Sequence, residues 1–259
     1  MCIRDRRKTT VTAMVEGLMQ ELDPLGINQI VTRLHMQAVT VHGIEVATSV
    51  DFERFAAVRA QLRNDAISPY FDPQHNGPEL SQSAFWIEGR RDGDPVYVEA
   101  YRLYQPTGPF NHWCRAWLMD AHTRAGEDVH ISSVAEPMSE PASRLGGRMA
   151  YRGELFMSPA LRGGPKSRLI NDISLLHHAL VWGYWKPDDI WGLTTEDRAQ
   201  RGMLRRIYYN HLEEGFIVWG RRPACVEQDR ETLCYQPRHQ IIRDLAAVGS
   251  GYQASIGTS

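Results

Sequence analysis

The stretch RGELFMSPALRGGPKSRLINDISLLHHAL, residues 152–180, contains a short apolar run, a glycine-containing turn and a second apolar segment. The run over 150–159 predicts a β-strand. After the turn, apolar residues recur every three or four positions from Leu169 to Leu180, which predicts one buried face of an α-helix. The predicted order is therefore strand, turn, helix.

The turn combines basic, hydroxyl and flexible residues, namely Arg162, Gly163, Gly164, Pro165, Lys166 and Ser167. The first turn of a helix exposes backbone N–H groups and the positive end of the helix dipole, and both favour an anion. Glycines allow a close approach of the backbone. The turn therefore predicts a phosphate or pyrophosphate site, although its spacing is neither that of a P-loop nor Gly-x-Gly-x-x-Gly. The alternative is an ordinary turn with solvated basic residues.

Composition argues against several classes of partner. The chain has 259 residues, 42% hydrophobic and 23% charged, and a net charge of −2, which argues against a nucleic acid as partner. No apolar run reaches about 18 residues, so no membrane partner is expected. The four cysteines have no zinc-site spacing, and a cytoplasmic location is the default. We expect no metal: the adjacent His177 and His178 point different ways on a helix.

The chain divides into three parts. Residues 1–6, MCIRDR, resemble a translated sequencing-adapter fragment of a bacterial metagenomic reading frame, and we set them aside as an artefact. Residues 7–40 predict a helical N-terminal extension. Residues 41–259 form the main domain, in which 106–148 is an insertion that we expect to be irregular apart from a helix near 110–123.

The main domain alternates between strand and helix patterns. We predict a strand at 44–49, a helix from residue 51 capped by Ser49 or Asp51, and a β-hairpin with strands at 84–88 and 96–104. Later elements are a strand at 189–194, a helix over 195–214 and strands at 216–220 and 231–236. The fold class is therefore α/β, with a mixed central β-sheet flanked by helices.

The element order and two segments, LFMSPALRGGPKSRLI at 155–170 and YYNHLEEGFIVW at 208–219, resemble the GNAT N-acetyltransferase superfamily. The resemblance covers 44–246 and implies the acyl-CoA N-acyltransferase fold. It also implies acetyl-CoA or another acyl-CoA as cofactor, bound by Leu155, Phe156, Met157, Arg162, Gly163, Gly164, Lys166 and Ser167. Two residues depart from the later glycines of the family's loop, Pro165 and Ser167, and Pro165 also removes an N–H donor.

The same resemblance implies a proton donor for the departing CoA thiolate. The family often has a tyrosine four residues before a Gly-Phe pair, and here Gly215-Phe216 places His211 at that position. A histidine suits this role, and Tyr208, three residues earlier, is the alternative. Both residues also have ordinary interpretations, His211 as a surface residue of the helix and Tyr208 as a core residue.

Candidates for deprotonating the amine are Glu154 in the central strand, Glu99 in the hairpin and a water molecule. Glu154 is the more suggestive because it lies in an apolar strand, although it could be a solvated strand residue. Backbone N–H groups near Phe156 or Met157 are expected to stabilise the oxyanion.

The sequence thus predicts an N-acyltransferase that most simply moves acetyl from acetyl-CoA to the amine of a small molecule or a protein. One alternative is a longer-chain acyltransferase of the same fold, and another is a non-catalytic acyl-CoA-binding or regulatory module. In the insertion, Phe110, Trp113 and Trp117 predict a lid over the acceptor or acyl end, with a dimer contact or packing on the core as alternatives. A homodimer is a further expectation.

Overall fold

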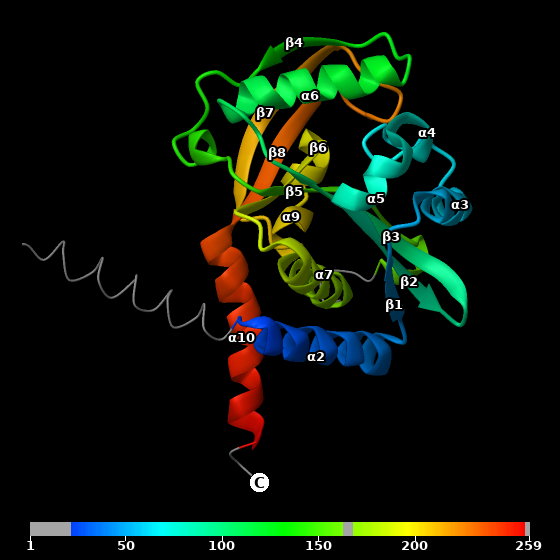
Figure 1. The fold of residues 1–259 in the computed structure, drawn as a ribbon, viewed down its shortest axis with the longest axis vertical. Helices are drawn as coiled ribbons and strands as arrows, with labels where there is room; N and C mark the ends of the chain where they lie inside the picture. Colours follow the sequence, from blue (N-terminus) through cyan, green and yellow to red (C-terminus); the bar gives the residue numbers. More distant parts are fainter. Residues whose placement is uncertain (1–21, 163–167, 257–259) are drawn as a thin grey trace, which may run out of the picture.

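The computed structural model describes residues 22–162 and 168–256, with side chains as far as Val248. It contains an eight-stranded sheet in the order β1-β2-β3-β5-β6-β8-β7-β4, with helices on both faces (Figure 1). Neighbouring strands are antiparallel except β5 and β6, which are parallel. The predicted fold class is confirmed.

The strands are β1 (Glu45–Ser49), β2 (Ala84–Arg91), β3 (Asp94–Tyr104), β4 (His130–Val134), β5 (Met149–Met157), β6 (Asp189–Thr195), β7 (His211–Arg221) and β8 (Arg230–Pro237). The α-helices are α2 (Pro24–His42), α3 (Phe52–Leu62), α4 (Pro73–Asn76), α5 (Leu80–Ser83), α6 (Phe110–Arg124), α7 (Leu169–Trp185), α8 (Glu196–Gln200), α9 (Met203–Arg206) and α10 (Arg238–Ile256). Short 3₁₀ turns lie at Gly77–Glu79, Ala142–Arg144 and Pro159–Leu161.

The sheet separates two hydrophobic cores because side chains alternate between its faces. In β3, Tyr97 and Tyr101 pack in the core that contains α2, α7 and α10, whereas Val98 and Ala100 pack in the core that contains α3 and α6. Figure 1 shows α10 continuing beyond the sheet after crossing α2. Among the helices within the described ranges, none is long and apolar enough to cross a membrane.

The described part of the predicted 7–40 extension is helical and belongs to the core, whereas residues 7–21 lie outside the described residues. Asp23 caps α2 by accepting the N–H of Gly26 at 2.7 Å, and Pro24 occupies the first turn. The helix ends at Gly43, whose φ of 63° is left-handed. Ile27, Ile30 and other buried residues of α2 pack against α7. Residues 1–6 lie outside the described residues.

The prediction of a single helix over 195–214 is wrong. Two short helices, α8 and α9, occupy its first half, and the chain then turns at Tyr208 (φ 70°) and enters β7 at His211. Gly202, at φ 73°, separates the two helices. β7 hydrogen-bonds to β8 on one side and to β4 on the other. Pairing on both sides outweighs the helical propensity of the segment.

The insertion contains more structure than predicted. The helix expected near 110–123 is α6, but β4 was not expected and adds a strand at the β7 edge of the sheet. α6 buries Phe110, Cys114 and Leu118 in the core beneath the sheet. The insertion packs on the core, which is one of the alternatives predicted for it.

The C-terminal helix α10 was not predicted.

The middle of the sheet opens between its two parallel strands. β5 and β6 pair only from Met149–Asp189 to Tyr151–Trp191, although β5 continues to Met157 and β6 to Thr195. The carboxyl halves of the two strands therefore diverge. A crevice at the carboxyl ends of parallel strands is a common place for a ligand site in α/β proteins.

Candidate functional site

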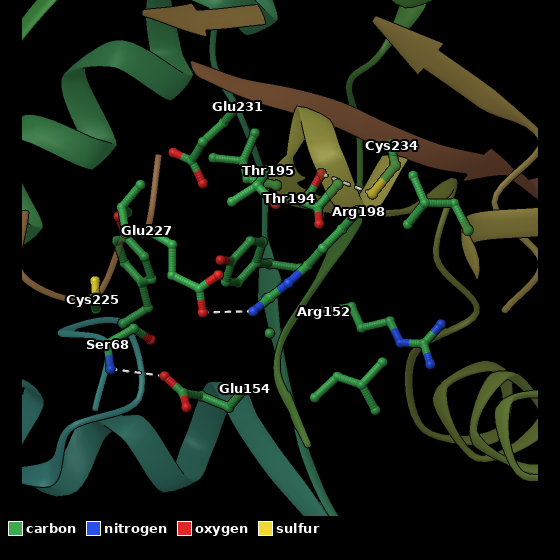
Figure 2. Close-up of a pocket in the computed structure, with 18 of the residues that line it drawn as sticks. Ser68, Arg152, Glu154, Thr194, Thr195, Arg198, Cys225, Glu227, Glu231 and Cys234 are labelled. Atoms are coloured by element: carbon green, nitrogen blue, oxygen red, sulfur yellow. Dashed lines mark hydrogen bonds and ion pairs between the residues drawn. The ribbon is translucent and has the colours of Figure 1, made fainter. Parts of the chain in front are cut away.

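Two adjacent cavities occupy the opening between β5 and β6. The inner cavity, of about 180 Å³, is lined by 151–155 of β5 and 192–195 of β6 (Figure 2). The outer cavity, of about 660 Å³, continues along β5 to Met157. Both are lined by Arg63, Leu155, Arg198, Met203 and Glu227, so the two cavities are adjacent.

Four of the predicted cofactor residues line the outer cavity: Leu155, Phe156, Met157 and Arg162. The Nε of Arg162 donates to the carbonyl of Met157 at 2.9 Å, and its guanidinium lies 5.4 Å from the centre of the Phe156 ring. The other four, Gly163, Gly164, Lys166 and Ser167, lie outside the described residues.

The outer cavity is rich in positive charge. Its lining contains five arginines and two carboxylates, namely Arg63, Arg162, Arg198, Arg201, Arg206, Asp65 and Glu227. Three of these arginines pair with carboxylates, namely Arg63 with Asp65, Arg198 with Glu227 and Arg201 with Asp197. Guanidinium groups bind phosphate oxygens in a bidentate manner, so the lining, with Arg162 among its arginines, suits a phosphorylated ligand.

A β-bulge in β5 lies where the two cavities meet. Val98 pairs with Phe156 and Ala100 pairs with Gly153, so two residues of β5 lie opposite Glu99 alone. They are Glu154 and Leu155, and Leu155 lines both cavities. A bulge leaves the extra residue out of the ladder and redirects the strand. Its backbone N–H groups near Leu155 are thus candidates for holding a ligand oxygen, slightly upstream of the predicted Phe156 and Met157.

Glu154 serves as a counter-ion in this structure and is not a solvated strand residue. It lies at φ 57°, a left-handed conformation that is unfavourable for a residue with a Cβ. One carboxylate oxygen accepts the Nε–H of buried Arg59 at 2.5 Å. The other accepts the N–H of Ser68 at 2.7 Å, as Figure 2 shows. Both oxygens thus already accept a hydrogen bond, and Glu154 also lines the inner cavity, so its predicted role as the base stays a prediction.

Glu99, unlike Glu154, lies away from both cavities. It is fully buried between the sheet and α7, where it accepts hydrogen bonds from Arg152 and from the hydroxyl of Tyr97 at 3.0 Å, and contacts His177. It lines neither cavity. Burial lowers the pKa of His177 to about 3, so this imidazole is neutral.

His177 and His178 face different partners, as their adjacent positions on a helix require. His177 contacts Glu99, whereas the ring of His178 lies 5.8 Å from that of Tyr208. Within 22–162 and 168–256, no group of three or more His, Cys, Asp or Glu residues is arranged to hold a metal.

The predicted proton donors do not line the cavities. His211 lies in β7, where its ring stacks on Tyr235 at 5.0 Å and its Nε2 lies 3.2 Å from Gln240. Tyr208 packs against the α7 core. Neither residue lines either cavity. The reason is the turn that replaces the predicted helix, because it changes the direction of every side chain from 207 onward.

Tyr209, which was not among the predicted site residues, lines the inner cavity. It is 3% exposed, and its hydroxyl makes no hydrogen bond to any part of the chain that the structure describes. Burial raises the pKa of this phenol well above its usual value, so the hydroxyl stays protonated. The guanidinium of Arg152 lies 5.6 Å from the ring centre and donates to the carbonyl of Ile207 at 3.0 Å. Arg152 thus holds the turn that presents Tyr209.

Glu231 is the second residue that the sequence analysis missed. It lies in β8 and is 7% exposed, and one carboxylate oxygen accepts the indole N–H of Trp219 at 2.8 Å. It lines the inner cavity (Figure 2). Burial raises its pKa to about 7. A signal was present: alternation along β8 places Glu231 on the same face as apolar Leu233 and Tyr235, which identifies a buried carboxyl group.

The raised pKa of Glu231 predicts a pH-dependent stability. A carboxyl group whose pKa rises on folding stabilises the fold below its ordinary pKa of 4.5, and that contribution is lost as pH rises through about 7. The shift corresponds to about 3 kcal/mol. Between pH 4.5 and 8, the unfolding free energy of Glu231→Gln should therefore rise relative to wild type by about this amount, measured by urea denaturation at several pH values.

Other titrating groups do not obscure this comparison. The groups that interact electrostatically with Glu231 are Tyr70, Tyr151, Cys114, Cys225 and Cys234, and burial raises the pKa of each well above neutrality. Asp189 also has a pKa raised to about 7, but it is present in both proteins. The exposed Glu214→Gln is the matched control and should show no pH-dependent difference. An equally flat difference for Glu231→Gln would show that Glu231 titrates normally.

Comparison with known proteins gives similarity of fold only. No protein-family model matches the chain, and no curated protein matches it by sequence. Among solved structures, it is similar to FeeM, an N-acyl amino acid synthase from uncultured soil microbes, at 11% identity, 76% of this chain, 92% of that chain and a TM-score of 0.43. A GNAT-family acetyltransferase from Streptococcus agalactiae matches at 11% identity, 75% and 95% of the two chains, and TM-score 0.37. Arabidopsis thaliana NAA60 in complex with acetyl-CoA matches at 14% identity, over 75% of this chain and 98% of that chain, with a TM-score of 0.37.

Proposed function

We propose that the chain is an acyl-CoA-dependent N-acyltransferase, whose simplest reaction transfers acetyl from acetyl-CoA to an amine. The observation that supports this most directly is the meeting of two chemically different cavities at the bulge of β5. The outer cavity suits an elongated phosphorylated donor because arginines surround it. The inner cavity suits an acceptor because it presents a carboxyl group and a phenol.

The residues of the outer cavity fit acyl-CoA. Arg162 and the neighbouring arginines would contact its phosphate groups, and the apolar residues Leu155, Phe156 and Met157 would lie along its uncharged arm. Bound acyl-CoA would supply an acyl group that is already activated as a thioester. The acceptor would be the amine of a small molecule or of a protein.

Three groups of the chain would move or stabilise charge. The carboxylate of Glu231 would take a proton from the amine, and the hydroxyl of Tyr209 would give a proton to the departing sulfur. Backbone N–H groups of the bulge near Leu155 would stabilise the developing oxyanion. In this proposal Tyr209 takes the role first predicted for His211 or Tyr208, and Glu231 takes that of Glu154.

The proposal predicts that Arg162 contributes to CoA affinity. Hydrogen bonds to charged groups are worth about 1.5–3 kcal/mol, so Arg162→Ala should weaken CoA binding by that amount in isothermal titration calorimetry. Arg144→Ala is the matched control, because Arg144 lies outside both cavities. Equal affinities of wild type and Arg162→Ala would exclude a phosphate-binding role for Arg162.

The reaction itself is tested by thiol release from acetyl-CoA in the presence of amines. Turnover that increases with acyl length across an acyl-CoA series would favour the longer-chain acyltransferase. CoA binding without thiol release for any amine and any acyl length would instead favour the non-catalytic binding module.

A further inference from the structure

The charged side chains that line the inner cavity differ in whether they have an oppositely charged partner. Its lining contains four arginines and three glutamates, namely Arg59, Arg63, Arg152, Arg198, Glu154, Glu227 and Glu231. Each arginine already has a carboxylate partner: Arg59 pairs with Glu154, Arg63 with Asp65, Arg152 with Glu99, and Arg198 with Glu227 at 2.6 Å. The arginines therefore leave little positive charge for a ligand inside this cavity.

Glu231 is the exception among these seven groups. Over the described ranges it forms no ion pair, and its hydrogen-bond partner is the neutral indole of Trp219. Several titratable groups interact electrostatically with Glu231, among them Tyr70, Tyr151 and Cys225, and burial raises the pKa of each so that they are neutral at physiological pH. The uncompensated charge of the inner cavity is consequently negative.

The remaining lining suits an ammonium group and an apolar body. The hydroxyls of Ser68 and Tyr209 are buried and make no hydrogen bond to the described part of the chain. The aromatic rings of Tyr70 and Tyr151 also line the cavity. Buried polar groups without partners are uncommon and point to a ligand, and aromatic faces attract cations.

We infer that the acceptor, given the proposed function, is a primary amine that carries no carboxylate, and that Glu231 selects it by pairing with its ammonium group. The carboxylate of an amino acid would be desolvated in a cavity whose arginines are all paired, and it would face Glu231 as a like charge. An unpaired or repelled charge is costly in a buried site and acts against the wrong ligand. The cavity thus favours an amine over the amino acid from which it differs by one carboxylate.

Pairs of compounds that differ only by this carboxylate test the inference. They are tyramine and tyrosine, tryptamine and tryptophan, agmatine and arginine, and cadaverine and lysine. Binding to the full chain is measured by calorimetry without CoA, and turnover is measured by thiol release from acetyl-CoA. For the pair that binds best, the amine should exceed the amino acid at least tenfold in affinity and in kcat/KM. Equal or stronger use of the amino acid would overturn the inference.

Variants separate selection by charge from a general loss of structure. Because Glu231 is also the proposed base, this variant is compared by binding without CoA: Glu231→Gln should keep the shape of the side chain and its hydrogen bond from Trp219 but lose the preference for the amine in calorimetry. The exposed Glu214→Gln should keep the preference. A preference that survives in folded Glu231→Gln, verified by thermal denaturation, would overturn the role of Glu231. The comparison of amine with amino acid in the wild type does not depend on any variant.

Failure of the proposed function gives a different pattern. If tyramine or another amine binds selectively but no acyl-CoA supports thiol release, the selectivity of the cavity stands and the acyltransferase proposal fails. If thiol release occurs with amino acids and none of the amines binds, the acyltransferase proposal stands and this inference fails.

Discussion

Replacing Tyr209 with phenylalanine should lower kcat by roughly 10²-fold or more, which is the scale of general acid catalysis, with little change in CoA affinity. The physical reason is that this hydroxyl lies in the inner cavity, is kept protonated by burial and has no hydrogen-bond partner in the described residues. The change removes one oxygen atom and retains the ring that packs above Arg152. Steady-state thiol release and CoA titration measure the two quantities.

The hydroxyl is buried and unpaired, so its removal should not destabilise the fold. Thermal denaturation of Tyr209→Phe should therefore match that of the wild type. Tyr208→Phe is the matched control, since it removes the same atom from the adjacent side chain, and it should be nearly silent. His211→Ala should also retain turnover. If His211→Ala or Tyr208→Phe loses activity while Tyr209→Phe keeps it, the proton donor is one of the two residues first predicted.

Local patterns were sufficient to predict most of the fold. The two β-rich runs of the β2–β3 hairpin, the cap at Asp51 and the periodicity of α7 are determined by neighbouring residues, and the structure contains each of them. The helix predicted over 195–214 failed because β7 is fixed by pairing with β4 and β8, and β4 itself lies in a segment without a clear pattern. Long-range pairing of this kind leaves little trace in a short window.

The candidate site was harder to predict for a related reason. Its donor side, at Leu155–Met157 and Arg162, follows from one continuous strand and turn, and those residues do line the outer cavity. Its acceptor side depends on a one-residue difference: Tyr208 and Tyr209 are adjacent, and only the turn at Tyr208 decides which one enters the cavity. Glu231 comes from β8, the neighbour of β6, and its role depends on the divergence of β5 and β6, which no local pattern encodes.

A buried ion pair beneath the inner cavity gives the largest expected effect on stability. Arg152 and Glu99 are 5% and 0% exposed, and Arg152 also donates to the hydroxyl of Ser174 at 3.1 Å and to the carbonyl of Ile207. Breaking a buried pair leaves one charge without a partner in a low-dielectric interior, at a cost of about 3–5 kcal/mol. Arg152→Met and Glu99→Gln should each lower the unfolding free energy by that amount in urea denaturation.

The double variant Arg152→Met/Glu99→Leu tests whether the loss of stability in the single variants comes from leaving one buried charge without a partner. Replacing both charges by apolar residues of similar size avoids the unpaired charge, so the double variant should be more stable than either single variant. The exposed pair Arg144–Glu140 is the matched control, and Arg144→Met should cost less than about 1 kcal/mol. The double variant should nevertheless lose turnover, because the bond from Arg152 to Ile207 holds the turn that presents Tyr209. Full activity in a stable double variant would show that this turn holds Tyr209 without Arg152, and the positioning role of Arg152 would then be excluded.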